Sequence, residues 1–245
     1  MSLYADVRKG ERSLTAETLE KAVEAIDADN CTPAADKPVY SFFKRAADIV
    51  LSLAASAVLL IPCLIISLAI FAEDRGPVIY AHSRVGKNGR VIKVYKFRSM
   101  RSDADNISKY LTPEQQQEFY KEYKLKNDPR VTRVGRLLRK TSLDELPQIF
   151  LNVLILGNMS VVGPRPVVMD ETMLYGGSRD ALLSVKPGLT GFWAAYSDKD
   201  TSYEDGSRQR MELYYIKNRS ALLDLKIIFK TVGTVFERCF MKEAD

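Results

Sequence analysis

The sequence predicts a mainly α-helical protein with a small β element, attached to one membrane face by a helix that enters the bilayer, breaks and returns. Three features support this monotopic, re-entrant fold. Ile49–Ala72 is a run of 24 residues without a charge, long enough to span a bilayer as a helix. Pro62 lies near the middle of that run. Residues 128–140 combine arginines with regularly spaced apolar residues, as interfacial amphipathic helices do.

The first forty residues differ in charge from the rest of the chain. Residues 1–38 contain five Lys/Arg and eight Asp/Glu, whereas the remainder contains 31 and 23, for a net charge of +5. We expect residues 1–40 to form an acidic extension, helical over 13–30, followed by a proline-containing linker. The polar start predicts no signal peptide. The basic remainder favours a polyanionic partner: phosphates, nucleic acid or an anionic membrane surface.

The apolar run lies within residues 41–75, and two features argue against a simple crossing. Pro62 cannot donate a backbone hydrogen bond to the carbonyl of Val58 and collides with it, so the helix kinks or breaks. Basic residues flank the run on both sides, with eight Lys/Arg and no acid between Asp74 and Asp103. Because basic flanks resist export, we expect a helix–break–helix with both ends on the cytoplasmic face. A kinked single span with an exported C-terminal domain is the alternative.

Residues 76–245 are expected to form a cytoplasmic, membrane-associated domain. The β-prone runs 78–80 and 91–97 flank the turn sequence GKNGR, which predicts a hairpin. The polar segment 103–128 is helix-prone and could be a lid-like insertion. Near the end of the chain, residues 220–240 present the broad apolar face of a helix.

The segment 128–140 is predicted to be an interfacial amphipathic helix. Its apolar residues fall on one face: Val131, Val134, Leu137 and Leu138. Its arginines fall on the other, so the helix could lie along a lipid surface. A solvated charged face over a soluble core is the alternative.

Histidine and cysteine content excludes several site classes. The one histidine, His82, makes a histidine pair or a Ser-His-Asp triad hard to build. The three cysteines are far apart: Cys31, Cys63 and Cys239. A disulfide framework or a zinc site is therefore not expected, and a reducing compartment fits.

Two adjacent acids, Asp144 and Glu145, follow fifteen residues without an acid. Ser142 and Glu145 match a capping box, and Pro147 requires the following helix to begin close to Asp144. Both carboxylates would then lie at the positive end of a helix. The structural interpretation is that they cap this helix. The functional one is that they share a divalent cation, because adjacent ionised acids are otherwise poorly suited to burial.

Basic residues around the acid pair favour the functional interpretation. Arg139, Lys96 and Arg98 could pair with the phosphoryl oxygens of a diphosphate substrate, while Mg²⁺ neutralises the remaining charge. An aspartate such as Asp144 is also a competent nucleophile at phosphorus, because it forms an acyl phosphate that a second acceptor can discharge. These residues predict phosphoryl-transfer chemistry.

Three long motifs stand out along the chain: YKFRSM at 95–100, DPRVTRVGRLLRKTSLDELPQIFLNVLIL at 128–156 and MSVVGPRP at 159–166. Together they resemble the bacterial sugar transferase family, the membrane-embedded phosphoglycosyl transferases that load a sugar-1-phosphate onto polyprenyl phosphate. The similarity also includes KRAADIVLSLAAS and YYIKNRSALLDLKIIFKT, and it runs from about Ser41 to about Phe240.

The resemblance implies a ping-pong reaction. Asp144 matches the nucleophile, which attacks the sugar-bearing phosphate of a nucleotide sugar, with uridine as the expected nucleoside. Glu145 matches the Mg²⁺ ligand, and Arg139 the arginine that contacts phosphate. Pro164, Arg165 and Pro166 match the nucleotide-side loop. The phosphosugar would pass from Asp144 to polyprenyl (undecaprenyl) phosphate, so the expected partners are these two substrates and membrane lipid, not nucleic acid; a homo-oligomer is left open.

The implied location is the cytoplasmic face of a bacterial inner membrane, where such an enzyme would initiate synthesis of a surface glycan, such as an exopolysaccharide, capsule or lipopolysaccharide. In one respect the chain departs from the family: Ile61 precedes Pro62, where the family often has serine. A serine hydroxyl could satisfy freed backbone groups at the break, and Ser56 is too far upstream to replace it. The rival interpretation is a non-catalytic membrane adaptor whose basic surface binds anionic lipid.

Overall fold

The computed structural model describes residues 16–122, 125, 127–197 and 206–240. The α-helices in this part are α2 Ala16–Glu24, α3 Pro38–Glu73, α4 Ile107–Tyr110, α5 Pro113–Glu122, α6 Arg133–Thr141, α7 Arg179–Leu183, α8 Phe192–Tyr196, α9 Ser207–Asn218 and α10 Ala221–Phe240. The strands are β1 Ile79–Val85, β2 Val91–Phe97, β3 Ser160–Val162 and β4 Gly188–Thr190. Short 3-10 segments are η1 Lys87–Gly89, η2 Leu143–Glu145 and η4 Asp170–Ser178, and η3 Ile149–Ile155 is a π-helix. The mainly helical class with a small antiparallel β element is confirmed.

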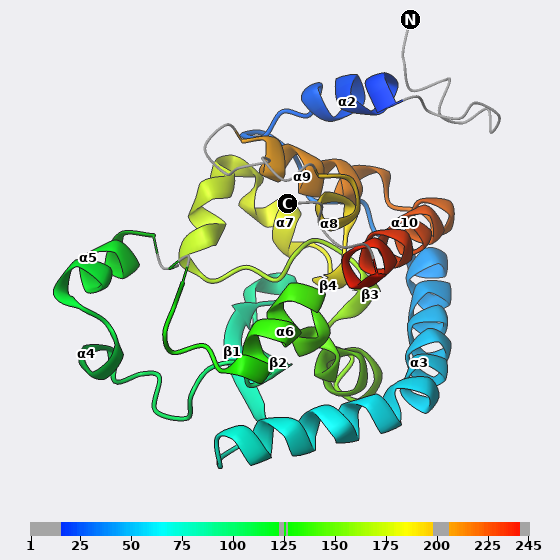
Figure 1. Cartoon of the computed structure of the whole chain (residues 1–245). Helices are drawn as coiled ribbons and strands as arrows, with labels where there is room; N and C mark the ends of the chain where they lie inside the picture. The colour runs from blue at the N-terminus through cyan, green and yellow to red at the C-terminus, as the bar shows by residue number, and fades with distance from the viewer. Residues whose placement is uncertain (1–15, 123–124, 126, 198–205, 241–245) are drawn as a thin grey trace, which may run out of the picture.

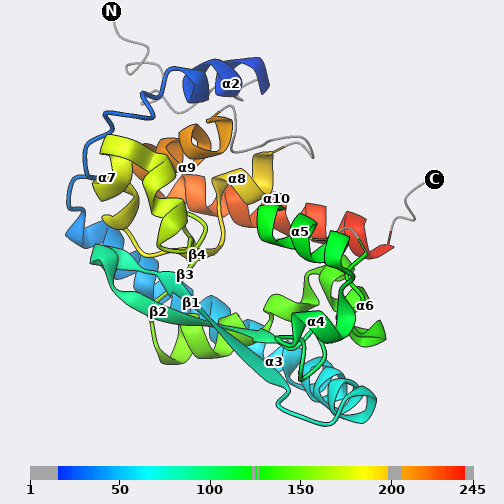
Figure 2. The ribbon, with the colours of Figure 1, turned by 90° about the vertical axis from the view of Figure 1, so that its left-hand side faces the viewer.

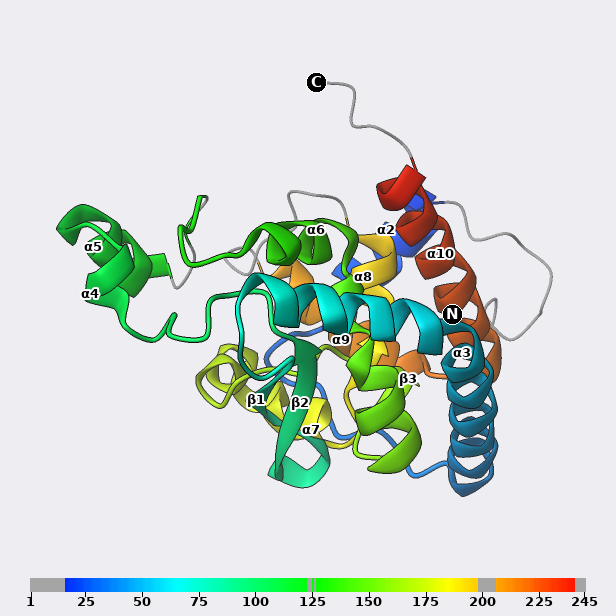
Figure 3. The same cartoon turned by 60° about the horizontal axis from the view of Figure 1, so that its bottom comes forward.

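The long helix α3 bends part way along, so that its two arms run in clearly different directions (Figures 1 and 3). Pro62 lies inside it, and a proline removes one helical hydrogen bond and displaces the carbonyl one turn earlier. Ser56 Oγ donates to the carbonyl of Ser52 at 2.6 Å, a contact that itself favours bending. Ser56 therefore does not cover the carbonyl of Val58, as expected from its position.

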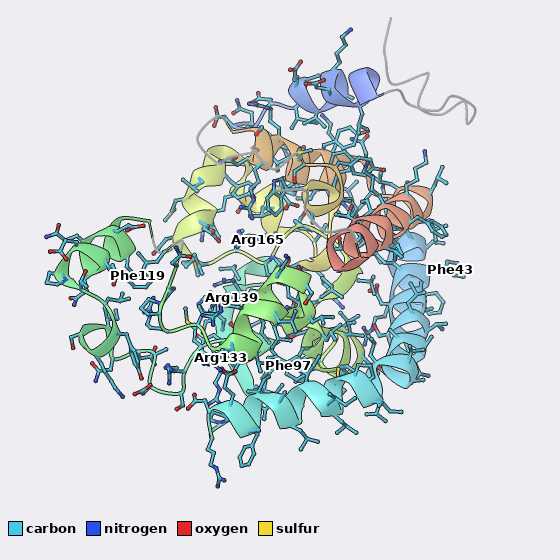
Figure 4. All side chains as sticks on the ribbon, in the orientation of Figure 1. Phe43, Phe97, Phe119, Arg133, Arg139 and Arg165 are labelled. Atoms are coloured by element: carbon cyan, nitrogen blue, oxygen red, sulfur yellow. The ribbon has the colours of Figure 1, made fainter. Side chains whose placement is uncertain are left out.

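The surface of α3 is unusually apolar for a helix outside a core. Among the described residues it is the one helix long and apolar enough to cross a membrane, and only 6% of its most apolar stretch is buried. Phe43 projects away from the body of the protein (Figure 4) and is 65% exposed. An exposed apolar surface of this extent indicates contact with a membrane or another protein. The re-entrant path itself stays a prediction.

The predicted hairpin is present, with a longer first strand than expected. β1 and β2 pair antiparallel, and Tyr80 lies opposite Lys96 while His82 lies opposite Val94. Asn88 and Gly89 have left-handed backbones, with φ of 60° and 73°, as the turn requires. Because side chains alternate along a strand, His82 and Lys96 lie on the same face of the hairpin.

The main core surrounds α9, and the N-terminal extension packs on it. Leu213, Tyr215 and Ile216 of α9 are at most 1% exposed, and Val23 of α2 and Ile26, just after α2, belong to the same cluster. In Figures 1 and 2, α2 lies over α9, on the side of the molecule away from the C-terminal arm of α3. The linker is also fixed, because Cys31 N donates to Ser178 Oγ at 2.7 Å and Arg219 donates to the carbonyl of Ala35 at 2.7 Å. Residues 1–15 of the predicted extension lie outside the described residues.

A smaller core joins the end of α3 to the hairpin and to α6. Its buried members are Ile70, Phe97 and Leu138. Leu138 is 1% exposed whereas its neighbour Leu137 is 60% exposed, so α6 has apolar residues on both its inner and its outer surface. Phe97 points into this core, so the neighbouring Lys96 points to the opposite face of the hairpin.

The polar segment after the hairpin forms α4 and α5, which extend from the body (Figure 1). Arg130 holds the return of this segment, because it pairs with Asp128 at 2.7 Å and lies 4.4 Å over the ring of Phe119. Whether the segment closes as a lid stays a prediction.

Candidate active site

The acid pair lies on the 3-10 turn η2, between α6 and η3. Ser142 ends α6 with a left-handed backbone, φ 58°, and its side chain makes no capping bond. The predicted capping box is therefore wrong: the left-handed backbone of Ser142 is not the extended conformation that a cap requires, and Glu145 instead contacts Lys96. The segment after Pro147 is also not a regular α-helix, because η3 winds as a π-helix, a form frequent at functional sites.

Lys96 of β2 reaches both acids from the face of the hairpin opposite the core. Its Nζ lies 2.5 Å from Glu145 Oε1 and 3.7 Å from Asp144 Oδ2. The three predicted site residues therefore meet, although they come from a strand and a turn that are about fifty residues apart in the sequence. One ammonium group therefore faces two carboxylates, and the pair of acids keeps an excess of negative charge that a cation could neutralise.

Asp144 has the drier environment of the two acids. Its side chain is 14% exposed and that of Glu145 is 39% exposed. Burial raises the pKa of Asp144, the positive charge of Lys96 opposes this rise, Glu145 adds to it and Arg139 opposes it. Such a carboxylate has lost much of its water shell yet retains cations nearby, which suits attack on a phosphate.

Arg139 lies in the last turn of α6, close to the end of β2, the strand that contains Lys96. Its Nε donates to Ser99 Oγ at 2.9 Å. Gly135 allows this close approach of α6, because a Cβ there would collide with the backbone of Ser99. The remaining guanidinium nitrogens of Arg139 have no protein partner in the described part of the chain, so they are available to a ligand.

Arg98 is not brought to the acid pair. It is 7% exposed, donates to the carbonyl of Asp74 and lies 3.7 Å from the Asp74 carboxylate. Arg98 therefore fixes the C-terminal end of α3. Lys96, not Arg98, is the strand residue in contact with the acids.

Residues 164–166, which we call the PRP loop, contribute two of their three side chains to a cavity of about 140 Å³ beside the acid pair. Arg165 and Pro166 line this cavity together with Lys96 and Glu145, whereas Pro164 borders a separate, smaller depression. Figure 4 shows Arg139 and Arg165 toward the centre of the molecule, from different segments. The loop is held by Glu171, whose Oε2 accepts from the backbone N–H of Val168 at 3.0 Å.

Sequence reasoning missed several residues that line this cavity. They are His82, Arg84, Val94, Gln148, Gly188, Leu189, Thr190, Gly191 and Glu212. Strand alternation from Lys96, combined with the hairpin register, could have indicated the first three. Burial and the neighbouring cations Arg84, Lys96 and Lys93 lower the pKa of His82, so its ring is neutral at pH 7. Nothing in the sequence signals the others, because β4 and α9 reach the site only through the tertiary fold.

The acid pair suits a cation that is shared with a substrate. Among the described residues, no group of three or more His, Cys, Asp and Glu side chains could hold a metal ion alone. Magnesium, however, usually takes one or two carboxylates and completes its shell with water and substrate phosphates. Asp144 and Glu145 fit that donor set, and the Lys96 ammonium is the positive charge against them in this structure.

Comparison with known proteins identifies the family of the chain. The model of the family described as bacterial sugar transferase matches residues 39–238. The chain is 45% identical over 202 residues to the undecaprenyl-phosphate galactose phosphotransferase of Salmonella typhimurium, covering 80% of this chain and 41% of that protein. It is 40% identical over 228 residues to the UDP-glucose:undecaprenyl-phosphate glucose-1-phosphate transferase of Escherichia coli, covering 87% and 45%. It is 43% identical over 205 residues to the exopolysaccharide production protein ExoY of Rhizobium meliloti, covering 81% and 88%.

These relatives differ in length. The chain spans less than half of the Salmonella and Escherichia proteins and most of the Rhizobium protein.

Proposed function

The chain belongs to the bacterial sugar transferase family, and on that premise we propose that it transfers a hexose-1-phosphate from a nucleotide sugar to undecaprenyl phosphate. The contact of Lys96 with both Asp144 and Glu145 is the observation that supports this most. A dry carboxylate beside a second acid and a cation fits a nucleophile that acts on a charged phosphate. The product would be the lipid-linked sugar that starts an exopolysaccharide or another surface glycan.

The proposed reaction has two steps at Asp144. In the first, a carboxylate oxygen of Asp144 forms a bond to the sugar-bearing phosphorus, and the bond from that phosphorus to the nucleoside monophosphate breaks. The monophosphate, UMP for a UDP-sugar, leaves with the electron pair. In the second, a phosphate oxygen of undecaprenyl phosphate attacks the same phosphorus, which releases the Asp144 carboxylate and the diphosphate-linked sugar. Splitting the transfer into two displacements at one nucleophile gives a ping-pong mechanism.

The neighbours of Asp144 have distinct proposed roles. Lys96 and Arg139 pair with phosphoryl oxygens and stabilise the charge that develops on them. Glu145, with Asp144, would hold Mg²⁺, which when bound neutralises the phosphate charge. Arg165 and Pro166, which line the cavity, would border the donor where its sugar-bearing phosphate joins the nucleotide. Removal of Mg²⁺ is therefore expected to abolish turnover.

The proposed location is the cytoplasmic face of the inner membrane. The exposed apolar residues of α3 are matched on α10 by Leu225 at 51% exposure and Phe229 at 74%. A bent helix with basic flanks and a second helix with an apolar outer face would together seat the site at the lipid surface. There the polar nucleotide sugar and the polyprenyl acceptor can both reach Asp144.

A screen of nucleotide sugars tests the proposed function. We expect the purified protein, given undecaprenyl phosphate and Mg²⁺, to release a nucleoside monophosphate from at least one UDP-hexose, and to stop when the ion is chelated. The rival function, a membrane adaptor that binds anionic lipid, predicts vesicle binding and no monophosphate from any donor.

A further inference from the structure

Glu212 is a buried acid that the proposed mechanism does not use. It lies on α9, Ser207–Asn218, and is 1% exposed, among the fully buried side chains of the protein. Its neighbours along the helix, Leu213 and Ile216, belong to the main core. A carboxyl group in such a place is costly unless its oxygens are hydrogen-bonded.

Within the described residues, one of the two carboxyl oxygens has a hydrogen-bond partner and the other has none. Oε1 accepts a hydrogen bond from the backbone N–H of Arg165 at 3.1 Å. Oε2 is buried and has no hydrogen-bond partner in the described part of the chain. Burial raises the pKa of Glu212 to about 7, against the effects of the Arg165 N–H and the charges of Arg208 and Arg165. Oε1 therefore supports the PRP loop, whereas no contact within the described residues explains why Oε2 is buried.

The residue that carries the unpartnered oxygen belongs to the wall of the candidate active site. Glu212 lines the same cavity as Lys96, Glu145 and Arg165. The wall beside Oε2 includes Gly191, where a Cβ would lie 3.9 Å from Oε2 and would collide with the carbonyl of Gly163. Glycine therefore leaves the space next to Oε2 clear of a side chain.

The size of the cavity limits what can enter it. Its volume is about 140 Å³, whereas pockets for drug-sized ligands are about 300–1,000 Å³. It can therefore take one ring of a nucleotide sugar and not the whole molecule. The sugar is attached to the phosphate that Asp144 would attack, and Glu145, next to Asp144, lines this cavity. Because the sugar is bonded directly to this phosphate, the sugar ring is the part of the donor that we expect to enter the cavity.

We propose that Oε2 of Glu212 accepts a hydrogen bond from a hydroxyl group of the donor's sugar, which makes Glu212 a specificity-determining residue. This inference rests on the proposed function, since it needs a nucleotide-sugar donor at the acid pair. A site built to bond a hydroxyl discriminates strongly against an analogue that lacks it, because the buried polar group is then left unpaired.

Glu212→Gln separates recognition of the sugar from support of the loop. The amide oxygen of glutamine can still accept from the Arg165 N–H, while its NH₂ group replaces an acceptor with a donor in the cavity. Glu171→Gln is the matched control, because Glu171 also holds this loop but does not line the cavity. Glu212→Asp is the second variant, used if the glutamine variant shows no thermal transition; it keeps the acceptor but withdraws it from the sugar.

The experiment measures kcat and KM for monophosphate release by the full chain in nanodiscs. Donors are the preferred UDP-hexose and its analogues that each lack one ring hydroxyl. We expect the parent to lose roughly 10–100-fold in kcat/KM with at least one deoxy analogue. Glu212→Gln should lose a similar factor with the complete donor, mainly through KM, and should no longer distinguish that analogue. Glu171→Gln should discriminate like the parent.

Unchanged discrimination in the Glu212 variants would overturn the assignment. The assignment would also be overturned if the Glu212 variants lost discrimination only against a donor methylated on its uracil ring, because Oε2 would then face the base and not the sugar. If the parent releases no monophosphate from any donor, the proposed function fails instead, so the two failures are distinguishable.

Discussion

Asp144 and Lys96 show how one strand residue changes the environment of a carboxylate. Burial alone would favour the neutral acid, but the Lys96 ammonium 3.7 Å away favours the charged, nucleophilic form. The sequence was sufficient to select both residues, because phosphoryl transfer needs acids next to bases. It was not sufficient to choose between Lys96 and Arg98. Both are basic residues at the end of β2, and only the fold engages Arg98 with Asp74.

Arg139→Ala is expected to lower kcat/KM by roughly 10–100-fold, the value of one charge-assisted hydrogen bond to phosphate. The fold should survive, because Arg139 is exposed and its side chain bonds only Ser99 within the described part of the chain. Lysine should restore only part of the rate, because it lacks the bidentate fork. The control is Arg136→Ala, an exposed arginine of the same helix. Equal rates for both alanine variants would return Arg139 to a solvated helix face.

Glu212 is expected to make stability depend on pH. The pKa of Glu212 is about 7 in the folded protein, against its ordinary value of 4.5 in the unfolded chain. The contribution to stability is therefore fully present below about pH 4.5 and is lost as pH rises through about 7, a change of roughly 3 kcal/mol. Between about pH 5 and pH 8, the thermal midpoint of the parent should fall relative to that of Glu212→Gln. Parallel midpoints over this range would mean that the carboxyl titrates normally.

At the scale of elements, local sequence patterns predicted which helices and strands exist better than they predicted where each one begins and ends. The hairpin, the polar insertion and the long apolar helix follow from composition and periodicity, which are local. The capping box failed because α6 closes on a left-handed Ser142. The π-helical winding of η3 also depends on its neighbours: Asn152 donates to the carbonyl of Lys93 at 2.6 Å and accepts from Tyr95 N at 3.0 Å. Such non-local bonds have no signature in a single sequence.

Replacement of Pro62 tests the proposed path of α3. Pro62→Leu removes the clash of the proline ring and restores the missing hydrogen bond, effects that together are worth about 3 kcal/mol in a helix interior, and so makes a continuous span more favourable. Lys87 lies in the exposed hairpin turn, so a cysteine there reports the side of the membrane. In a cysteine-free background, Lys87→Cys should be shielded in intact cells for the parent and partly labelled with Pro62→Leu. Labelling of the parent from outside would refute the re-entrant path.

At the scale of the whole molecule, the fold assembles one site from distant segments. The parallel pair β3–β4 places Gly188 opposite Ser160, so the PRP loop lies beside Thr190 and Gly191 in one cavity wall. Residues of the hairpin line the same cavity, and α3 with α10 exposes apolar side chains that suit lipid. The family motifs predicted Lys96, Glu145, Arg165 and Pro166 among the residues of this cavity, but the β3–β4 pairing and Glu212 came only from the fold.

The central claim is that Asp144 is the nucleophile, and the mass of the intact protein tests it most directly. The protein is incubated with its UDP-sugar donor and Mg²⁺ but no undecaprenyl phosphate, so the second step cannot proceed. The parent should gain the mass of one phosphosugar and release one equivalent of monophosphate, whereas Asp144→Asn should gain nothing, because an amide is not a nucleophile. Lys140→Ala is the control for an exposed nearby change. An adduct that persists in Asp144→Asn, or full turnover by that variant, would contradict the claim.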